Sequence, residues 1–224
     1  MPRSTPDDPS PSSEAPMPGR GKRRKRPFWQ EWIAVIGAAL LLTVGTQTFL
    51  ARAYVIPSGS MEPTLHGCHG CVDDRVIVDK MVYRFHPPQP GDVIVFHAPD
   101  TDWKKDLPAD DDTLIKRVIA VGGETVWCDG AKVFVDGAPL HEPYVSWNGS
   151  PGHQQTFGPV TVPQDRLWVM GDNRNDSADS RAHQYTARDQ GTVGLDDVVG
   201  KARAVFWPID RWQGLSDADP QSVH

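Results

Sequence analysis

The sequence lacks the local motifs that mark the most familiar hydrolases. Its 224 residues contain no Gly-x-Ser-x-Gly elbow and no His-Glu-x-x-His pair, which argues against an α/β-hydrolase turn and against the helical zinc site of many metalloproteases. No internal repeat is present, which excludes a solenoid, and no stretch after residue 53 sustains a helical period. Proline (21) and glycine (20) are plentiful, so the chain favours short strands and turns over long helices.

Positive charge is scarce outside the N-terminus. Residues 1–27 hold seven Lys/Arg against three Asp/Glu, whereas the remainder holds 16 against 26. A basic tail on an acidic body does not describe a nucleic-acid binder; it indicates a chain that lies in two environments. Because its first residues are rich in Pro and Ser and poor in apolar side chains, we expect residues 1–27 to be a disordered, basic, cytoplasmic tail.

A long uncharged run follows six positive charges at residues 20–26. Residues 33–51 would span roughly 28 Å as a helix, close to the ~30 Å hydrocarbon thickness of a bilayer. The pattern predicts a single transmembrane anchor over residues 28–52 in the plasma membrane, with the N-terminus in the cytoplasm and the following domain on the extracytoplasmic face. A cleavable signal peptide ending at residues 51–53 (ARA) is the alternative, although the apolar run is longer than such a peptide needs.

The rest of the chain consists of β-branched segments separated by turn residues. Two Asp-Gly pairs, at residues 129–130 and 136–137, predict tight hairpin turns. We therefore predict a mainly β fold: a β-rich ectodomain over residues 53–207, with a small inserted β subdomain at about 124–160, and a C-terminal tail at 208–224. The predicted strands are residues 75–83, 92–97, 114–121, 125–128, 132–135, 166–170 and 201–207.

A stiff turn, residues 56–65 (IPSGSMEPTL), follows the apolar run closely. Pro57 and Pro63 restrict the backbone on either side, and Gly59 frees it beside Ser60. A serine on such a turn is a candidate nucleophile, but it needs a base, because a serine hydroxyl is a weak nucleophile at neutral pH. Taken alone, the composition is more typical of an ordinary turn.

The candidate base lies in the predicted strand at residues 114–121 (LIKRVIAV), since none of the eight histidines stands in a distinctive context. Alternation places Lys116 and Arg117 on opposite, otherwise apolar faces, so the pattern does not decide which cation is buried. Only the lysine can give up its proton in a protein. A lysine is half neutral at pH 7 if its pKa falls by about 3.4, at a cost of roughly 4.6 kcal/mol, and burial can lower a lysine pKa by about 3–5. A lysine that extends its ammonium to water is the alternative.

A dense polar string, residues 171–181 (GDNRNDSADSR), follows an apolar strand. It is either a solvated loop or a hydrogen-bonded wall. A calcium loop is disfavoured, because Arg174 stands where an oxygen ligand is required and no glycine stands at the sixth position.

The three cysteines include a close pair in residues 66–71 (HGCHGC). On an extracytoplasmic face Cys68 and Cys71 can form a disulfide, which leaves Cys128 over. Two inert thiols are an alternative. Zinc is a further alternative, although four potential ligands within six residues are more crowded than the usual two separated pairs.

Four segments resemble, in order, the boxes of the bacterial type I signal peptidases, a family of Ser-Lys dyad peptidases. These segments are residues 57–65 (PSGSMEPTL), 91–96 (GDVIVF), 115–119 (IKRVI) and 171–181 (GDNRNDSADSR). The resemblance runs from the predicted anchor to about residue 207 and is closest to single-span, Gram-positive or actinobacterial members. It implies a β-rich catalytic core that carries a smaller β domain between the lysine and the last box.

The resemblance also implies roles for individual residues. Ser60 would be the acylating nucleophile and Lys116 its general base. The Ser58 hydroxyl would form the oxyanion hole with the Ser60 backbone N–H, and Ser177 would position the lysine ammonium. The remaining implied residues are Asp179 and Arg181, which would brace the loop, and Ile56, Met61 and Ile115, which would line shallow pockets for small substrate side chains.

Two features depart from the family pattern. Asn175-Asp176 stands where the family more often has Asp-Asn, which leaves the hydrogen bonds of that segment open. The cysteine-containing residues 66–71 make the connection after the serine box longer than the shortest family versions.

The function implied is that of a membrane-anchored serine endopeptidase that removes signal peptides from secreted pre-proteins after a small-x-small motif, through an acyl-enzyme. Its partners would be these signal peptides and the phospholipid bilayer; we expect no cofactor, metal or nucleic acid, and a functional monomer. The alternatives are a self-cleaving Ser-Lys peptidase of the repressor kind and a non-catalytic, membrane-anchored β binding module. Residues 51–53 also resemble a substrate motif, so slow self-cleavage before Tyr54 is a side hypothesis.

Overall fold

A computed structural model describes residues 28–49, 51–68, 70–105, 107, 111–147, 152–185, 189–215 and 219–222. The predicted cytoplasmic tail, including its basic run, lies outside these residues. The chain divides into two units, with the boundary after residue 41.

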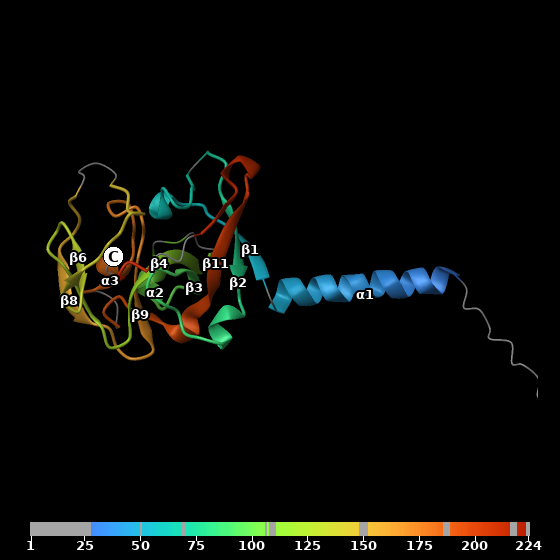
Figure 1. The fold of residues 1–224 in the computed structure, drawn as a ribbon, viewed down its shortest axis with the longest axis horizontal. Coiled ribbons are helices and arrows are strands. Elements are labelled where there is room, and N and C mark those ends of the chain that lie inside the picture. Colours follow the sequence, from blue (N-terminus) through green and yellow to red (C-terminus); the bar gives the residue numbers. More distant parts are fainter. Residues whose placement is uncertain are drawn as a thin grey trace, which may run out of the picture. The chain divides into compact units, whose positions relative to one another are not determined.

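The N-terminal helix α1 (Phe28–Phe49) is continuous over 22 residues (Figure 1). Large apolar side chains along it are exposed, among them Trp32 and Leu40. Within the described ranges, no helix meets the length and hydropathy required to cross a membrane. The helix ends at Phe49, so Ala51 and Arg52, which the sequence analysis assigned to the anchor, belong to the first strand instead.

The described chain after α1 is mainly β, as predicted, with helical segments of only three or four residues. The short helices are η1 (Gly59–Met61), η2 (Val82–Arg84), α2 (Thr101–Lys104), α3 (Ser180–His183), η3 (Leu195–Asp197) and η4 (Ile209–Arg211). The strands are β1 (Ala51–Val55), β2 (Arg75–Asp79), β3 (Val93–His97), β4 (Thr113–Val121), β5 (Thr125–Cys128), β6 (Val133–Val135), β7 (Ala138–Pro139), β8 (Phe157–Thr161), β9 (Arg166–Met170), β10 (Val193–Gly194), β11 (Val198–Trp207) and β12 (Gln213–Gly214).

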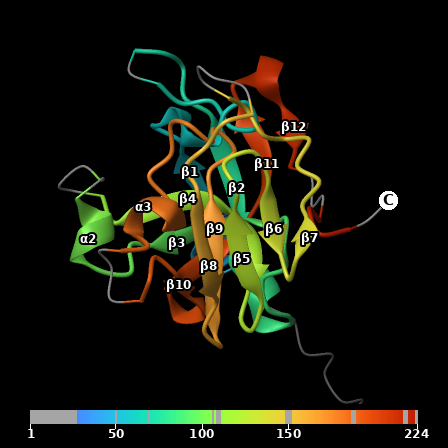
Figure 2. The same ribbon diagram turned by 90° about the vertical axis from the view of Figure 1, so that its left-hand side faces the viewer.

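Two antiparallel sheets organise these strands. The larger has the order β1-β2-β11-β3-β4-β9-β10, with β12 paired to β11, and the smaller has the order β7-β6-β5-β8. Figure 2 shows the strands of the smaller sheet side by side. The smaller sheet occupies residues 125–161, the part of the chain whose hairpin signals predicted an inserted subdomain.

Every strand predicted from sequence has a counterpart, and β5 and β9 have the predicted bounds. The strands that were missed are β1, β7, β8, β10 and β12. Three of them have only two residues, and β8 (FGPVT) contains the glycine and proline that argue against a strand in a sequence. The predicted C-terminal tail contains η4 and β12, and Gln221 donates a hydrogen bond to the Ile119 carbonyl at 3.2 Å, so this segment packs on the domain.

One of the buried clusters supports the turn that carries Ser60. Ile56, Met61 and Leu65 are at most 2 % exposed and pack in one cluster with Val76 and Val78 of β2. Full burial of such a side chain stabilises a fold by about 1.5–3 kcal/mol. The turn is therefore fastened to the sheet on both sides of Ser60.

Candidate active site

Ser60 lies in the middle of η1, on the turn between the two prolines. The turn is closed by backbone hydrogen bonds from Glu62 N to Gly59 O (3.1 Å) and from Leu65 N to Met61 O (3.0 Å). Ser60 itself is 7 % exposed. The buried apolar residues beside Ser60 fix its position in the fold, whereas its own side chain is directed to a polar partner.

That partner is Lys116 on β4. The Lys116 Nζ donates a hydrogen bond to the Ser60 Oγ at 2.7 Å, and the lysine is only 3 % exposed. Fifty-six residues separate the two along the chain, so the contact is made by the fold and not by local sequence. The alternative of a lysine that reaches out to water does not apply.

Ser58 lies next to this pair. Its Oγ is 3.2 Å from the Ser60 Oγ, and either hydroxyl can be the donor. Three side chains from two segments thus meet at one point, and their polar atoms are an amine and two hydroxyls.

These three residues face a cavity of about 410 Å³. Ile56 and Ile115, which sequence reasoning placed in substrate pockets, line it, as do Val95 and Leu114. Met61, also expected in a substrate pocket, is not among the residues that line this cavity: its side chain is fully buried in the cluster beneath the turn. The reason is the helical turn at η1, which directs Ser60 toward Lys116 and Met61 toward β2.

One edge of β4 is open beside the cavity. Strand β3 pairs with β4 from Thr113 to Arg117, whereas β9 pairs with it only from Arg117 onward. Among the described residues, positions 113–116 therefore have a strand partner on one side only. Unpaired backbone groups at such an edge can hydrogen-bond an extended peptide.

The polar string at residues 171–181 forms a hydrogen-bonded wall and not a solvated loop. Asp179 accepts from Gly171 N (3.0 Å) and from two nitrogens of Arg181 (2.8 and 2.6 Å), and Arg181 also donates to the Arg174 carbonyl at 2.8 Å. Burial works to raise the pKa of Asp179, but the Arg181 charge and these hydrogen bonds hold it below its usual value. The two residues brace the segment.

Ser177 is placed in this wall without the contact expected of it. Its hydroxyl is buried and forms no hydrogen bond of normal geometry with any described residue, Lys116 included. It lies near enough to Asp179 to contribute to the lowered pKa of that carboxyl. A Cβ at Gly171 would clash with the Ser177 Oγ and with the Ser60 carbonyl oxygen, so only glycine fits where the wall meets the serine turn.

Asn173 is a site residue that the sequence analysis missed. Its side-chain Nδ2 donates to the Gly59 carbonyl at 3.1 Å, and its backbone N–H donates to the Ser60 carbonyl at 3.1 Å. The polar wall therefore holds the serine turn directly. No local signal could have shown this, because the two segments are more than a hundred residues apart.

The second group that was missed is centred on Arg117. Its guanidinium binds both carboxylate oxygens of Asp172 (2.8 and 2.7 Å) and lies 3.9 Å from the centre of the Tyr144 ring. Asp172 also accepts from Thr64 Oγ1 at 2.5 Å. Burial works to lower the pKa of Arg117, but the bonds and charge of Asp172 raise it above its usual value. Both cations of β4 are thus buried.

The Asn175-Asp176 pair lies at the rim of the same site. Asp176 lines the cavity, and its backbone N–H donates to the Asn173 carbonyl at 3.1 Å. Arg174, one residue earlier, is paired with Glu142 and donates to the Gly171 carbonyl at 3.2 Å. The segment is therefore held in place around the inverted pair.

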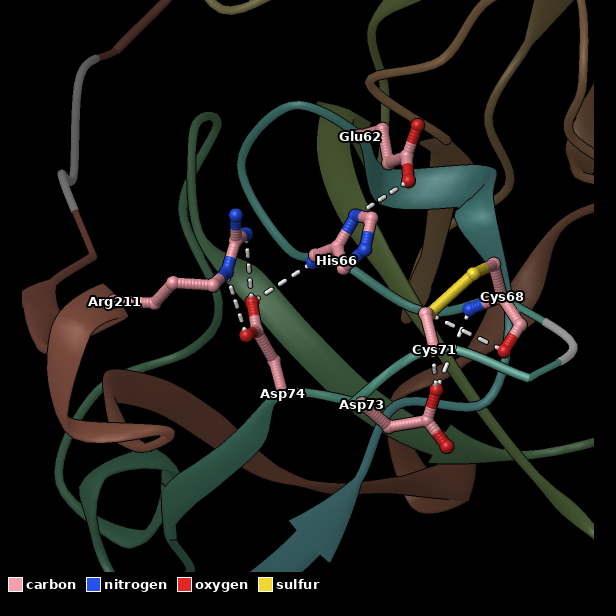
Figure 3. The surroundings of a disulfide bond; sticks show 7 residues. All are labelled: Glu62, His66, Cys68, Cys71, Asp73, Asp74 and Arg211. Carbon is pink, nitrogen blue, oxygen red and sulfur yellow. Dashed lines mark hydrogen bonds and ion pairs between the residues drawn. A yellow bond between two sulfur atoms is a disulfide. The ribbon is translucent and has the colours of Figure 1, made fainter.

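A disulfide joins Cys68 and Cys71 in the loop after the serine turn (Figure 3). This outcome agrees with the first of the alternatives left open by the sequence. Cys128 is free and buried, and burial raises the pKa of its thiol.

Comparison with known proteins places this site in a family. The model of the family described as signal peptidase, peptidase S26, matches residues 29–207. A probable signal peptidase I of Mycobacterium leprae is 45% identical over 91% of this chain and 84% of its own length. Signal peptidase I of Mycobacterium tuberculosis is 43% identical over 93% of this chain and 83% of its own length. Signal peptidase I of Leptolyngbya laminosa is 40% identical over 92% of this chain and 93% of its own length. The chain therefore belongs to the signal peptidase family, peptidase S26, and is a serine endopeptidase.

Proposed function

We propose that this chain removes signal peptides from secreted pre-proteins with a Ser60–Lys116 dyad. The observation that carries the proposal is the 2.7 Å contact between Lys116 Nζ and Ser60 Oγ at the wall of a cavity. A nucleophile and a base within hydrogen-bond reach are what acyl transfer requires. The curated relatives are named signal peptidase I, which supports the substrate class.

The reaction runs in two steps, which are acylation of Ser60 and hydrolysis of the acyl-enzyme. Neutral Lys116 takes the Ser60 hydroxyl proton as the oxygen attacks the scissile carbonyl, and the same proton passes to the leaving amine when the peptide bond breaks. Lys116 then takes a proton from a water that attacks the acyl-enzyme, and returns it to the Ser60 oxygen as the signal peptide leaves with a free carboxyl group. The working form is the neutral amine, so activity rises with pH as the lysine loses its proton.

The oxyanion of each tetrahedral intermediate is assigned to the Ser58 hydroxyl and the Ser60 backbone N–H. The Ser58 Oγ lies 3.2 Å from the attacking oxygen, close enough to reach the adjacent carbonyl oxygen after rotation. Asp179 and Arg181 support the wall behind the dyad, and Ser177, packed beside Gly171, is assigned to the lysine side of the site once the substrate is bound.

The substrate is assigned as an extended segment with small side chains. The open edge of β4 at residues 113–116 offers backbone partners to a peptide strand. Ile56 and Ile115 restrict the cavity, which favours a small-x-small motif before the cleaved bond. Met61 acts only from beneath, by supporting the turn.

We assign membrane anchoring to α1 (Phe28–Phe49), with the N-terminus in the cytoplasm and the catalytic domain at the extracytoplasmic face of the plasma membrane. The exposed apolar side chains of α1, such as Ile33, Ile36 and Leu42, support contact with a phospholipid bilayer. The site is complete within one chain, which fits a monomer.

The test compares Ser60→Ala and Lys116→Met with the wild type in detergent, with a pre-protein that carries a small-x-small motif as substrate. Loss of cleavage in both variants, with unchanged folding by circular dichroism, supports the dyad. Activity that survives in both overturns it. Cleavage of the chain itself but not of the pre-protein would indicate a self-cleaving peptidase, and binding without cleavage would indicate a binding module.

Self-cleavage before Tyr54 requires a separate observation. Ala53 and Tyr54 lie in β1 and pair with Ile77 and Val76 of β2. A bond held in a sheet must be released before it can enter a cavity as a substrate strand. N-terminal sequencing of the purified chain would detect Tyr54 as a new terminus if that release occurs.

A further inference from the structure

A cluster of metal-binding side chains lies outside the dyad, in the loop after the serine turn. In the described part of the chain, ligand atoms of His66, Cys68 and Cys71 all lie within 4.8 Å of one another (Figure 3). We propose that this loop, once its disulfide is reduced, is a binding site for one thiophilic divalent cation of the zinc type, with the two thiolates and the imidazole as ligands.

The geometry of the loop suits such an ion. Tetrahedral zinc with bonds of about 2.0–2.3 Å keeps its ligand atoms about 3.6 Å apart, so the imidazole needs only a small approach, while the two sulfurs, which are bonded in the disulfide, move a short distance apart on reduction. The spacing Cys-x-x-Cys is common in zinc sites, and Gly70, at φ 87°, turns the chain back between the two cysteines. The backbone closes the same turn with a bond from Cys71 N to Cys68 O at 3.3 Å.

The imidazole is already oriented for metal binding. His66 Nδ1 lies 2.8 Å from the Glu62 carboxylate. A carboxylate on one ring nitrogen holds the proton there, so the lone pair is on Nε2, and this is the usual arrangement behind a metal-bound histidine. Glu62 is therefore the orienting partner of the ligand and not a ligand itself.

The ends of the loop are clamped, which lowers the cost of ordering the ligands. Asp74 is fully buried, accepts from His66 N at 2.8 Å, and is bound by two nitrogens of Arg211 at 2.8 and 3.0 Å. The Asp74 carbonyl in turn accepts from Ile56 N at 2.9 Å. The loop is thus a preformed frame attached to the segment that leads to Ser60.

Metal binding to this loop begins with reduction of the disulfide. An external dithiol reduces the disulfide by exchange: it becomes a disulfide itself and leaves Cys68 and Cys71 as thiols. The cation displaces both thiol protons to solvent and accepts three lone pairs. Water or the Asp73 carboxylate, whose Oδ1 lies 3.8 Å from Cys71 Sγ, completes the fourth position.

The test uses the full chain in detergent, reduced with a phosphine, freed of metal with a chelator and kept without oxygen. Cobalt(II) is titrated as a spectroscopic probe, followed by displacement with zinc. We expect one cobalt per chain with a thiolate-to-cobalt absorption band, and affinity at least 100-fold above that of the Cys68→Ser/Cys71→Ser double variant. The oxidised wild type should match the double variant.

Single variants test the ligand set. His66→Gln and Glu62→Gln should each weaken binding about 10-fold or more, and Glu62→Gln should keep the charge-transfer band. His86→Gln, at an exposed histidine outside the loop, is the matched control. If the serine variants fail to fold, reduced wild type with alkylated thiols replaces them.

Two results would overturn the proposal. One is reduced wild type that binds cobalt no better than the double or alkylated protein, which would leave a disulfide as the only role of the pair. The other is an unchanged affinity and spectrum in His66→Gln. Because the readout is metal binding and not cleavage, failure here is distinguishable from failure of the Ser60–Lys116 dyad.

Discussion

Lys116 and Arg117 are neighbours on β4, equally buried, and have opposite surroundings. Lys116 faces a cavity and the Ser60 hydroxyl, whereas Arg117 faces Asp172, which binds it with two hydrogen bonds. A buried cation that is fully paired with a carboxylate serves the fold, because its charge is compensated. A buried amine that meets a hydroxyl at a cavity wall is suited to move a proton. The type of partner, and not burial, separates the two roles.

The substitution expected to have the largest effect is Lys116→Met, which tests whether the lysine serves catalysis and not the fold. We expect kcat/KM for a pre-protein to fall by about 10³-fold or more, since removing one member of a nucleophile–base unit abolishes most of its catalysis. The thermal midpoint should not fall, because methionine fills a similar volume without a polar group. Lys132→Met, at an exposed lysine, is the control. A destabilised but active Lys116 variant would reverse the assignment of the two cations.

The converse change is Arg117→Met. We expect it to lower the free energy of unfolding by about 3–5 kcal/mol, because Asp172 is left buried and without its partner. Urea denaturation measures the effect. The double variant Arg117→Met/Asp172→Leu should recover much of the loss. If the single and double variants are equally unstable, the cost does not come from the stranded carboxylate.

Asn173 follows Asp172 in the chain and binds the turn that carries Ser60. It therefore tests whether a contact that supports the fold also supports catalysis. Asn173→Ala removes the donor to the Gly59 carbonyl. Loss of one such bond should cost about 0.5–1.5 kcal/mol of stability and lower kcat about 10-fold, with KM little changed, because the serine turn loosens. Asn173→Asp, of nearly the same shape but without the amide donor, should behave alike. A change in KM alone would indicate substrate contact instead.

Acid stability gives the smallest expected effect. The pKa of Asp179 is lower in the folded protein than in the unfolded chain, so its pairing with Arg181 stabilises the fold fully above the unfolded pKa of about 3.9. That contribution is lost as pH falls through the folded pKa. In acid titrations of unfolding, Asp179→Asn should therefore show a flatter curve than wild type. Asp210→Asn, at an exposed carboxyl, is the control and should keep the wild-type slope.

Local patterns were sufficient for part of this molecule. Alternating β-branched residues and Asp-Gly turns located seven strands of the two sheets, and the stiff turn around Ser60 was recognisable from its prolines. Patterns failed where an element is two residues long or contains proline, as in β7 and β8, because pairing with a neighbour and not intrinsic preference makes those strands.

The site shows the same division. Ser60, Lys116, Asp179 and Arg181 could be named from sequence with the help of the family resemblance. The carbonyl contacts of Asn173 could not, since hydrogen bonds to a distant backbone leave no periodic trace. The family resemblance implied that Met61 lines a substrate pocket, whereas its side chain is buried beneath the turn, because consecutive residues of a helical turn point in different directions.

Local patterns in the chain were enough to establish the mainly β character of the domain, the stiff turn at Ser60 and a strand with one cation on each face. Those features depend on side-chain alternation and on the backbone limits of proline, which act over a few residues. Which cation meets a hydroxyl and which meets a carboxylate is set by the packing of the folded chain. That choice depends on what packs against each face of β4, and those partners come from residues more than fifty positions away.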